Sequence, residues 1–185
     1  MQLLTDESRP IIEAAFFREE LAHGDLWVPA DMREHSWVLC AALRSAMAAE
    51  LPFLRVHVNT INGDGHCWYV ARAIEEFANN CRTAANYAVR EYYTEALVTS
   101  NALSAGLIVA VACERRVCRS NTHFQFHGSS QKGEEHKDQG KAEWFGARTA
   151  LPEAEWMRMA QDGEPRDFGA EQALEWGVVH EIIDD

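Results

Sequence analysis

Strand-like runs alternate with amphipathic helical segments along this chain. Residues 54–58, Leu-Arg-Val-His-Val, alternate in polarity and are rich in β-branched side chains, as is typical of a strand. They lie between two segments, residues 31–50 and 67–79, whose apolar side chains recur at helical spacing. Successive strand–helix units bury their apolar faces best in a mostly parallel sheet with flanking helices. The sequence therefore predicts an α/β fold.

The other expected elements continue this alternation. We expect strands at residues 25–30, within 87–99, and at 116–120, 123–127 and 178–183. We expect helices at residues 8–22, 104–113, 152–159 and 170–177. Residues 128–140 are polar and contain several glycines, which predicts a loop. A chain of 185 residues suits one domain. We expect an N-terminal helical segment over residues 1–24 and a domain over residues 25–185.

Charge and composition exclude several classes of protein. The formal net charge is −12, and no basic cluster is larger than the pair Arg115–Arg116, so we expect no nucleic-acid binding. No apolar run approaches the roughly 20 residues of a membrane span, and the N-terminus lacks the cationic start of a signal peptide. The five cysteines form no Cys-x-x-Cys pair, which disfavours a zinc site or a disulfide framework. We expect a cytoplasmic protein without a metal or a cofactor.

Three short segments carry residues suited to chemistry. The glycine-containing turn Asn59–Gly65 follows a predicted strand, and such turns present backbone N–H groups. Ser104 precedes an apolar helical run, where free N–H groups favour a developing negative charge. His127 ends a predicted strand. Taken alone, each has an ordinary explanation, namely a turn, a helix cap and a half-exposed histidine.

Together these segments resemble the proteolytic subunit of Clp proteases, in the Clp/crotonase superfamily. Asn59–Gly63 is similar to the family's Asn-Ser-Pro-Gly-Gly turn, and Ser104–Gly106 to its nucleophile site. Phe124–His127 looks like the strand that ends in its general base. The stretch Arg166–Val179 resembles the family's C-terminal motif and is the most specific signal. The resemblance covers residues 25–183 and implies repeated ββα units with a mostly parallel sheet.

The resemblance also implies a set of catalytic roles. Ser104 would be the nucleophile, His127 the general base, and Asp167 the acid that orients the imidazole. Asp162 and Glu164 are alternatives for the acid. The backbone amides of Gly63 and Ala105 would form the oxyanion hole. The implied activity is that of a serine endopeptidase, in which a neighbouring base activates a weak hydroxyl nucleophile.

The implied partners are a peptide or unfolded protein substrate, further copies of the chain in a ring, and an ATP-dependent unfoldase. The chain has no Gly-x-x-x-x-Gly-Lys-Ser/Thr motif, so any ATP use would come from the partner. Two other functions stay open. One is a catalytically inactive Clp-like subunit of an assembly, and the other is a crotonase-type acyl-CoA enzyme.

Overall fold

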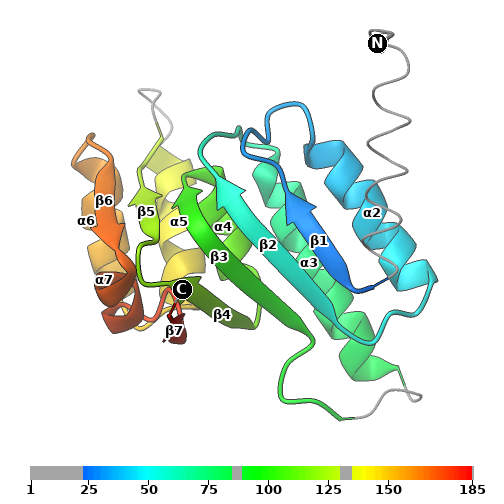
Figure 1. Cartoon of the computed structure of the whole chain (residues 1–185). Helices are drawn as coiled ribbons and strands as arrows, with labels where there is room; N and C mark the ends of the chain where they lie inside the picture. The colour runs from blue at the N-terminus through cyan, green and yellow to red at the C-terminus, as the bar shows by residue number, and fades with distance from the viewer. Residues whose placement is uncertain (1–22, 85–88, 130–134, 185) are drawn as a thin grey trace, which may run out of the picture.

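The computed structural model describes residues 23–84, 89–129 and 135–184. Within these residues the chain forms an α/β fold with a seven-stranded, mostly parallel sheet and flanking helices (Figure 1). The α/β prediction is confirmed. The predicted helix at residues 8–22, and nearly all of the predicted segment 1–24, lie outside the described residues.

The sheet has the order β1-β2-β3-β4-β7, and β5 pairs with both β3 and β6. Every pairing is parallel except the one between β5 and β6. Strand β3 pairs with β4 along Glu95–Val98 and with β5 along Asn101–Leu103. The strands are β1 (Asp25–Val28), β2 (Leu54–Thr60), β3 (Thr94–Leu103), β4 (Arg115–Arg119), β5 (His123–Phe126), β6 (Arg166–Gly169) and β7 (Glu181–Ile183).

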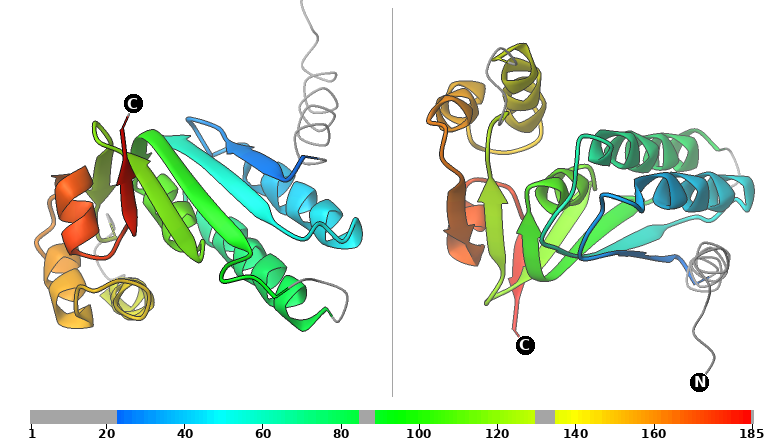
Figure 2. Two further views of the ribbon diagram at one scale, coloured as in Figure 1. Left: turned by 60° about the horizontal axis from the view of Figure 1, so that its bottom comes forward. Right: turned by 90° about the horizontal axis from the view of Figure 1, so that it is seen from above.

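Helices α2, α3 and α4 cover one face of β1, β2 and β3 (Figure 2). Helices α5 and α6 lie side by side next to β5 and β6 (Figure 1). The buried residues of α2, α3 and α6 are mostly apolar and lie on one face of each helix. Burial of this face against the rest of the protein stabilises these amphipathic segments as helices. The helices are α2 (Ser36–Ala48), α3 (Cys67–Thr83), α4 (Ala105–Val111), α5 (Glu135–Gly146), α6 (Glu153–Gln161) and α7 (Ala170–Glu175).

An aromatic cluster holds the end of β5 against α5 and α6. The Phe126 ring lies 5.2 Å from the Phe145 ring and 4.8 Å from the Trp156 ring, measured between centroids. Phe145 and Trp156 are themselves 4.8 Å apart, and all three side chains are buried. Large buried aromatic side chains contribute strongly to core stability. The cluster therefore fixes the backbone immediately before His127.

One predicted helix begins later than expected. Residues 31–50 were expected to be helical throughout, but α2 starts only at Ser36. The preceding residues pair with the turn after β2, where the Met32 N–H donates to the Asn62 carbonyl at 3.0 Å and Asp31 forms a β-bridge with Asn62. These contacts between distant segments outweigh the local helical pattern.

The predicted loop at residues 128–140 is wrong in its last part, because α5 begins at Glu135. The first turns of α5 are polar and lack helical apolar periodicity, so the pattern gives no local signal. The helix is held through its second half, where Ala142 and Phe145 are buried. Strand β6 was also not predicted. It has four residues and exists through its antiparallel pairing with β5.

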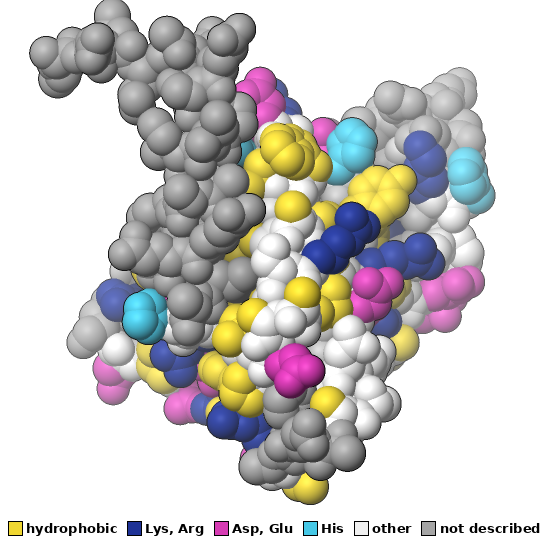
Figure 3. Space-filling view, turned by 90° about the vertical axis from the view of Figure 1, so that its right-hand side faces the viewer, with side chains coloured by type: hydrophobic (Ala, Val, Ile, Leu, Met, Phe, Trp, Pro, Cys, Tyr) yellow, Lys and Arg dark blue, Asp and Glu magenta, His cyan; other side chains and the backbone are white. Residues whose placement is uncertain are grey.

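Among the described helices, none is both long enough and apolar enough to span a membrane. The side of the molecule on which α2 lies carries hydrophobic side chains interspersed with charged ones (Figure 3). Trp37 of α2 and Tyr69 of α3 belong to the exposed large apolar side chains, with exposed fractions of 64% and 63%. Exposed aromatic residues of this kind often mark a binding surface.

Candidate active site

Ser104 lies at the sharp turn between β3 and α4. Its backbone angles are φ 51° and ψ −104°, a conformation that residues other than glycine rarely adopt. The turn is held on both sides, because the Ser104 N–H donates to the Gln125 carbonyl at 2.9 Å and the Ile108 N–H donates to the Ser104 carbonyl at 3.3 Å. The Ser104 side chain makes no helix-capping bond. A strained strand-to-helix turn that exposes a serine hydroxyl is typical of a nucleophile.

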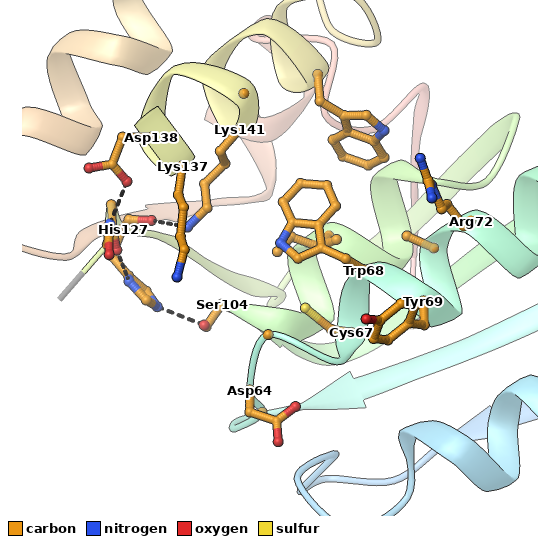
Figure 4. A pocket seen from close by; sticks show the side chains of 18 of the residues that line it. Asp64, Cys67, Trp68, Tyr69, Arg72, Ser104, His127, Lys137, Asp138 and Lys141 are labelled. Atoms are coloured by element: carbon orange, nitrogen blue, oxygen red, sulfur yellow. Dashed lines mark hydrogen bonds between the residues drawn. The ribbon is translucent and has the colours of Figure 1, made fainter. Parts of the chain in front are cut away.

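The Ser104 hydroxyl contacts the imidazole of His127. The Oγ–Nε2 distance is 2.6 Å (Figure 4). The other ring nitrogen, Nδ1, lies 2.7 Å from the Gly128 carbonyl oxygen. Because a carbonyl can only accept a hydrogen bond, this contact assigns the ring proton to Nδ1. Nε2 then accepts from the serine hydroxyl, which is the arrangement that a general base requires.

Sheet topology explains why two residues far apart in the sequence meet. The parallel pairing of β3 with β5 sets Leu103 opposite Gln125. Ser104 directly follows the end of β3, and His127 directly follows the end of β5. Carboxyl ends of adjacent parallel strands lie at the same edge of a sheet, where catalytic groups commonly gather. The structure therefore brings together the predicted nucleophile and the predicted base.

The turn after β2 lies against the start of α4. A Cβ atom built on Gly63 would lie 2.3 Å from the Cβ of Ala105, so this approach requires glycine. The Ala105 N–H is in the first turn of α4, where no carbonyl within the helix can accept it. The Gly63 N–H donates to the Asn62 side-chain oxygen at 2.9 Å. The two predicted oxyanion-hole residues are therefore neighbours. The N–H of Gly63 is already hydrogen-bonded to the Asn62 side chain.

The structure does not bring Asp167 to His127. The β5–β6 register sets Asp167 opposite Gln125, and its Oδ1 accepts from the Gln125 amide at 2.9 Å. The same carboxylate lies 3.2 Å from His123 Nε2, and its side chain is 54% exposed. The alternative acids are also exposed, and Asp162 pairs with Arg158 at 3.5 Å. None of the three predicted acids has a described hydrogen bond to the imidazole.

Two residues of α5 that were not predicted contact the backbone around His127. The Lys141 ammonium donates to the His127 carbonyl at 2.8 Å. The buried Asp138 carboxylate accepts the N–H of Ser129. Burial lowers the pKa of Lys141, and the neighbouring Asp138 carboxylate opposes this shift. In the sequence, the only sign of this pair is that the two charged residues are three positions apart. That spacing places them on one face only if residues 135–146 form a helix, which the sequence did not predict.

An open pocket of about 1020 Å³ lies over Ser104 and His127. Lys137 and Lys141 project into it from α5, and Trp68 and Tyr69 border it from α3 (Figure 4). A second hollow of about 740 Å³ lies between α2 and α3 and shares two lining residues with the first, Tyr69 and Arg72. The first hollow by itself provides room for a ligand longer than a single residue.

Among the described residues, neither a metal cluster nor the pocket cysteine provides a second reactive centre. Across residues 23–84, 89–129 and 135–184, no cluster of three His, Cys, Asp or Glu side chains could hold a metal ion. Burial raises the pKa of the pocket-lining Cys67 thiol to about 12, which leaves it protonated and unreactive at neutral pH. His57 pairs with Asp25 at 2.6 Å and stacks on Trp27, so it has a structural explanation.

In comparisons with known proteins, no family model and no curated protein matches the sequence.

Proposed function

We propose that this protein is a serine endopeptidase of the Clp proteolytic-subunit type, with Ser104 as the nucleophile and His127 as the general base. The observation that carries the proposal is the 2.6 Å contact between Ser104 Oγ and His127 Nε2, together with the Nδ1 contact that assigns the ring proton. The strained backbone at Ser104 supports the same role, because strain of this kind concentrates at functional sites.

The reaction follows from these contacts. His127 Nε2 accepts the Ser104 proton while Oγ attacks the carbonyl carbon of the scissile peptide. The tetrahedral intermediate collapses, the leaving amine takes the proton from Nε2, and an acyl-enzyme on Ser104 remains. Water attacks this ester while His127 Nε2 accepts its proton. The bond from the acyl carbon to Oγ then breaks, the carboxylic acid product leaves, and Nε2 returns the proton to Ser104 Oγ.

The Ala105 N–H and the Gly63 N–H are the proposed donors to the oxyanion. Ala105 follows the nucleophile directly, and its N–H has no acceptor within α4. The Gly63 N–H becomes available when it leaves the Asn62 side chain. Loss of one such donor typically reduces the rate about 100- to 1,000-fold.

The size of the pocket favours a peptide over a small ester. The pocket over Ser104 and His127 has a volume of about 1020 Å³, which has room for an extended peptide and is far larger than a small acyl group requires. The succession β1–α2, β2–α3 and β3–α4 repeats a unit of one strand and one helix, and the repeated ββα units that the Clp/crotonase resemblance implies remain part of the proposal.

The proposal extends to an assembly. Exposed Trp37 and Tyr69 provide apolar surface suited to contact with other chains. We propose a homo-oligomer, with a ring as its expected form, that receives unfolded substrates from an ATP-dependent unfoldase in a cytoplasmic setting. Chromatography with light scattering measures the number of chains.

One observation favours the second candidate, an inactive Clp-like subunit. The Gly63 N–H is occupied by the Asn62 side chain, so one oxyanion donor is engaged without substrate. The crotonase-type acyl-CoA alternative has less support, because the Ser104–His127 contact has no role in holding a thioester enolate. Calorimetric titration with coenzyme A tests this alternative directly.

The deciding experiment is treatment of the purified protein with a fluorophosphonate, with the adduct mapped by mass spectrometry. The proposal expects an adduct on Ser104 that is lost in Ser104→Ala and strongly reduced in His127→Ala. Hydrolysis of a fluorogenic peptide library then distinguishes a peptidase from another serine hydrolase. Folded protein that forms no adduct would count for the inactive subunit.

A further inference from the structure

Among the described residues, a peptide group and not a side-chain acid accepts the hydrogen bond from Nδ1 of the His127 imidazole. Its Nδ1 lies 2.7 Å from the carbonyl oxygen of Gly128. That carbonyl and the N–H of Ser129 belong to the same planar peptide unit. The N–H of this unit donates to the carboxylate of Asp138. A carboxylate therefore lies on the far side of the peptide whose oxygen accepts the imidazole proton.

Planarity makes this arrangement directional. In a trans peptide the N–H and the C=O point in opposite directions, so holding the Ser129 N–H at Asp138 directs the Gly128 carbonyl the other way, toward His127. A charged acceptor on the N–H also polarises the peptide and strengthens its carbonyl as an acceptor, as in other hydrogen-bond chains.

Two further contacts restrain the same segment. The preceding carbonyl, that of His127, accepts from the Lys141 ammonium at 2.8 Å. A Cβ atom built on Gly128 would lie 2.1 Å from the Ala160 carbonyl oxygen, so the backbone of α6 packs directly against the backbone at Gly128. Asp138 and Lys141 lie three residues apart on α5, which lets one helix face hold two consecutive peptide groups.

We propose that Asp138 and Lys141 are positioning residues that fix the Nδ1–H tautomer of His127 in place of a directly bonded acid. Asp138 acts through the Gly128–Ser129 peptide, and Lys141 acts through the preceding His127–Gly128 peptide. The inference rests on the proposed role of His127 as the base. It assigns no contact with substrate to either α5 residue. In the Nε2–H tautomer the imidazole could not accept the Ser104 proton, and a wrong tautomer in a serine–histidine site is costly to catalysis.

The test is a measurement of the imidazole ¹⁵N chemical shifts of His127 in protein labelled with ¹⁵N-histidine, at a pH where the ring is neutral. The unaltered protein is expected to show the Nδ1–H form. Asp138→Ala and Lys141→Met are expected to shift His127 toward the Nε2–H form and to slow fluorophosphonate labelling of Ser104 about 10- to 100-fold. Asp138→Asn keeps an oxygen acceptor for the Ser129 N–H, so it should restore most of the Nδ1–H population.

Gln139→Ala is the matched control, because this α5 side chain is exposed and bonds to Glu143 and Glu153 instead. It should leave the His127 tautomer unchanged. An unaltered protein whose neutral His127 carries its proton on Nε2 would overturn the inference without any variant. So would folded Asp138→Ala and Lys141→Met proteins that keep the Nδ1–H form. The tautomer is read without turnover, so this outcome is separate from a failure of Ser104 to react, which would overturn the peptidase proposal.

Discussion

Gly63 lies against Ala105 so closely that no side chain fits between them. A Cβ on Gly63 would meet the Ala105 Cβ at 2.3 Å, far inside van der Waals contact. This approach joins the turn after β2 to the start of α4 and sets the two proposed oxyanion donors beside each other.

Gly63→Ala is therefore expected to damage both activity and stability. The added methyl group forces the turn away from α4, which should reduce the Ser104 labelling rate at least about 100-fold by displacing one oxyanion donor. Overpacking of this kind should also reduce the free energy of unfolding by about 1–3 kcal/mol in urea titrations. Gly169→Ala is the control, because a Cβ there meets nothing within 4 Å. Equal effects of the two substitutions would contradict the proposed close approach.

At position 104, glycine should not be less stabilising than alanine, which is the reverse of the usual order. Glycine normally costs about 0.5–1 kcal/mol relative to alanine, because the unfolded chain gains more freedom. At φ 51° and ψ −104° alanine keeps the backbone strain, which amounts to about 1–3 kcal/mol. We expect Ser104→Gly to be at least as stable as Ser104→Ala in thermal and urea unfolding. The ordinary order, with alanine clearly more stable, would argue against a strained turn.

Asp167→Asn should leave the activity nearly intact. The Asp167 side chain is 54% exposed and contacts Gln125 and His123 instead of His127. Exposed ion pairs contribute about 0–1 kcal/mol, so the stability should also change little. We expect the Ser104 labelling rate and peptide hydrolysis to stay within a few-fold of the unaltered protein. A loss of several hundred-fold would restore Asp167 as the acid and require a different arrangement of β6 during catalysis.

His180 should make the protein less stable in mild acid. Burial and the Arg116 guanidinium lower the pKa of His180 to about 4, and its Nδ1 accepts from the Arg116 N–H at 3.0 Å. An unfolded histidine titrates near pH 6.5. Between these values the unfolded chain binds more protons, so the free energy of unfolding falls as the pH drops from about 6.5 to about 4. After allowance for solvent screening we expect about 1 kcal/mol from this group.

The check is urea unfolding at several pH values between 7.5 and 4, for the unaltered protein and for His180→Gln. The variant removes the titrating group, so its stability should decline less steeply over this range. Identical slopes in the two proteins would show that His180 is not held in its neutral form.

Sequence alone was sufficient where local pattern and final environment agree. The alternation of strand and helix predicted the α/β fold, and Leu54–Thr60 followed by Cys67–Thr83 forms the expected strand and helix. Ser104 and His127 were noted at a helix start and a strand end and were paired through the resemblance to the Clp proteolytic subunit, and the structure brings them within 2.6 Å. The fold prediction follows from apolar periodicity and from the order of elements, which are local properties of the sequence.

Tertiary structure decided what surrounds the imidazole. Asp167 occupies a short polar strand whose register is set by β5, and that register directs it to Gln125. Asp138 and Lys141 lie in a polar segment that is helical because Ala142 and Phe145 further along it are buried. Segments of this kind have weak local preferences, so contacts with distant residues determine both their conformation and the direction of their charged groups. The pair Ser104–His127 could be found by reading the chain, whereas the groups that orient it could be found only in the folded protein.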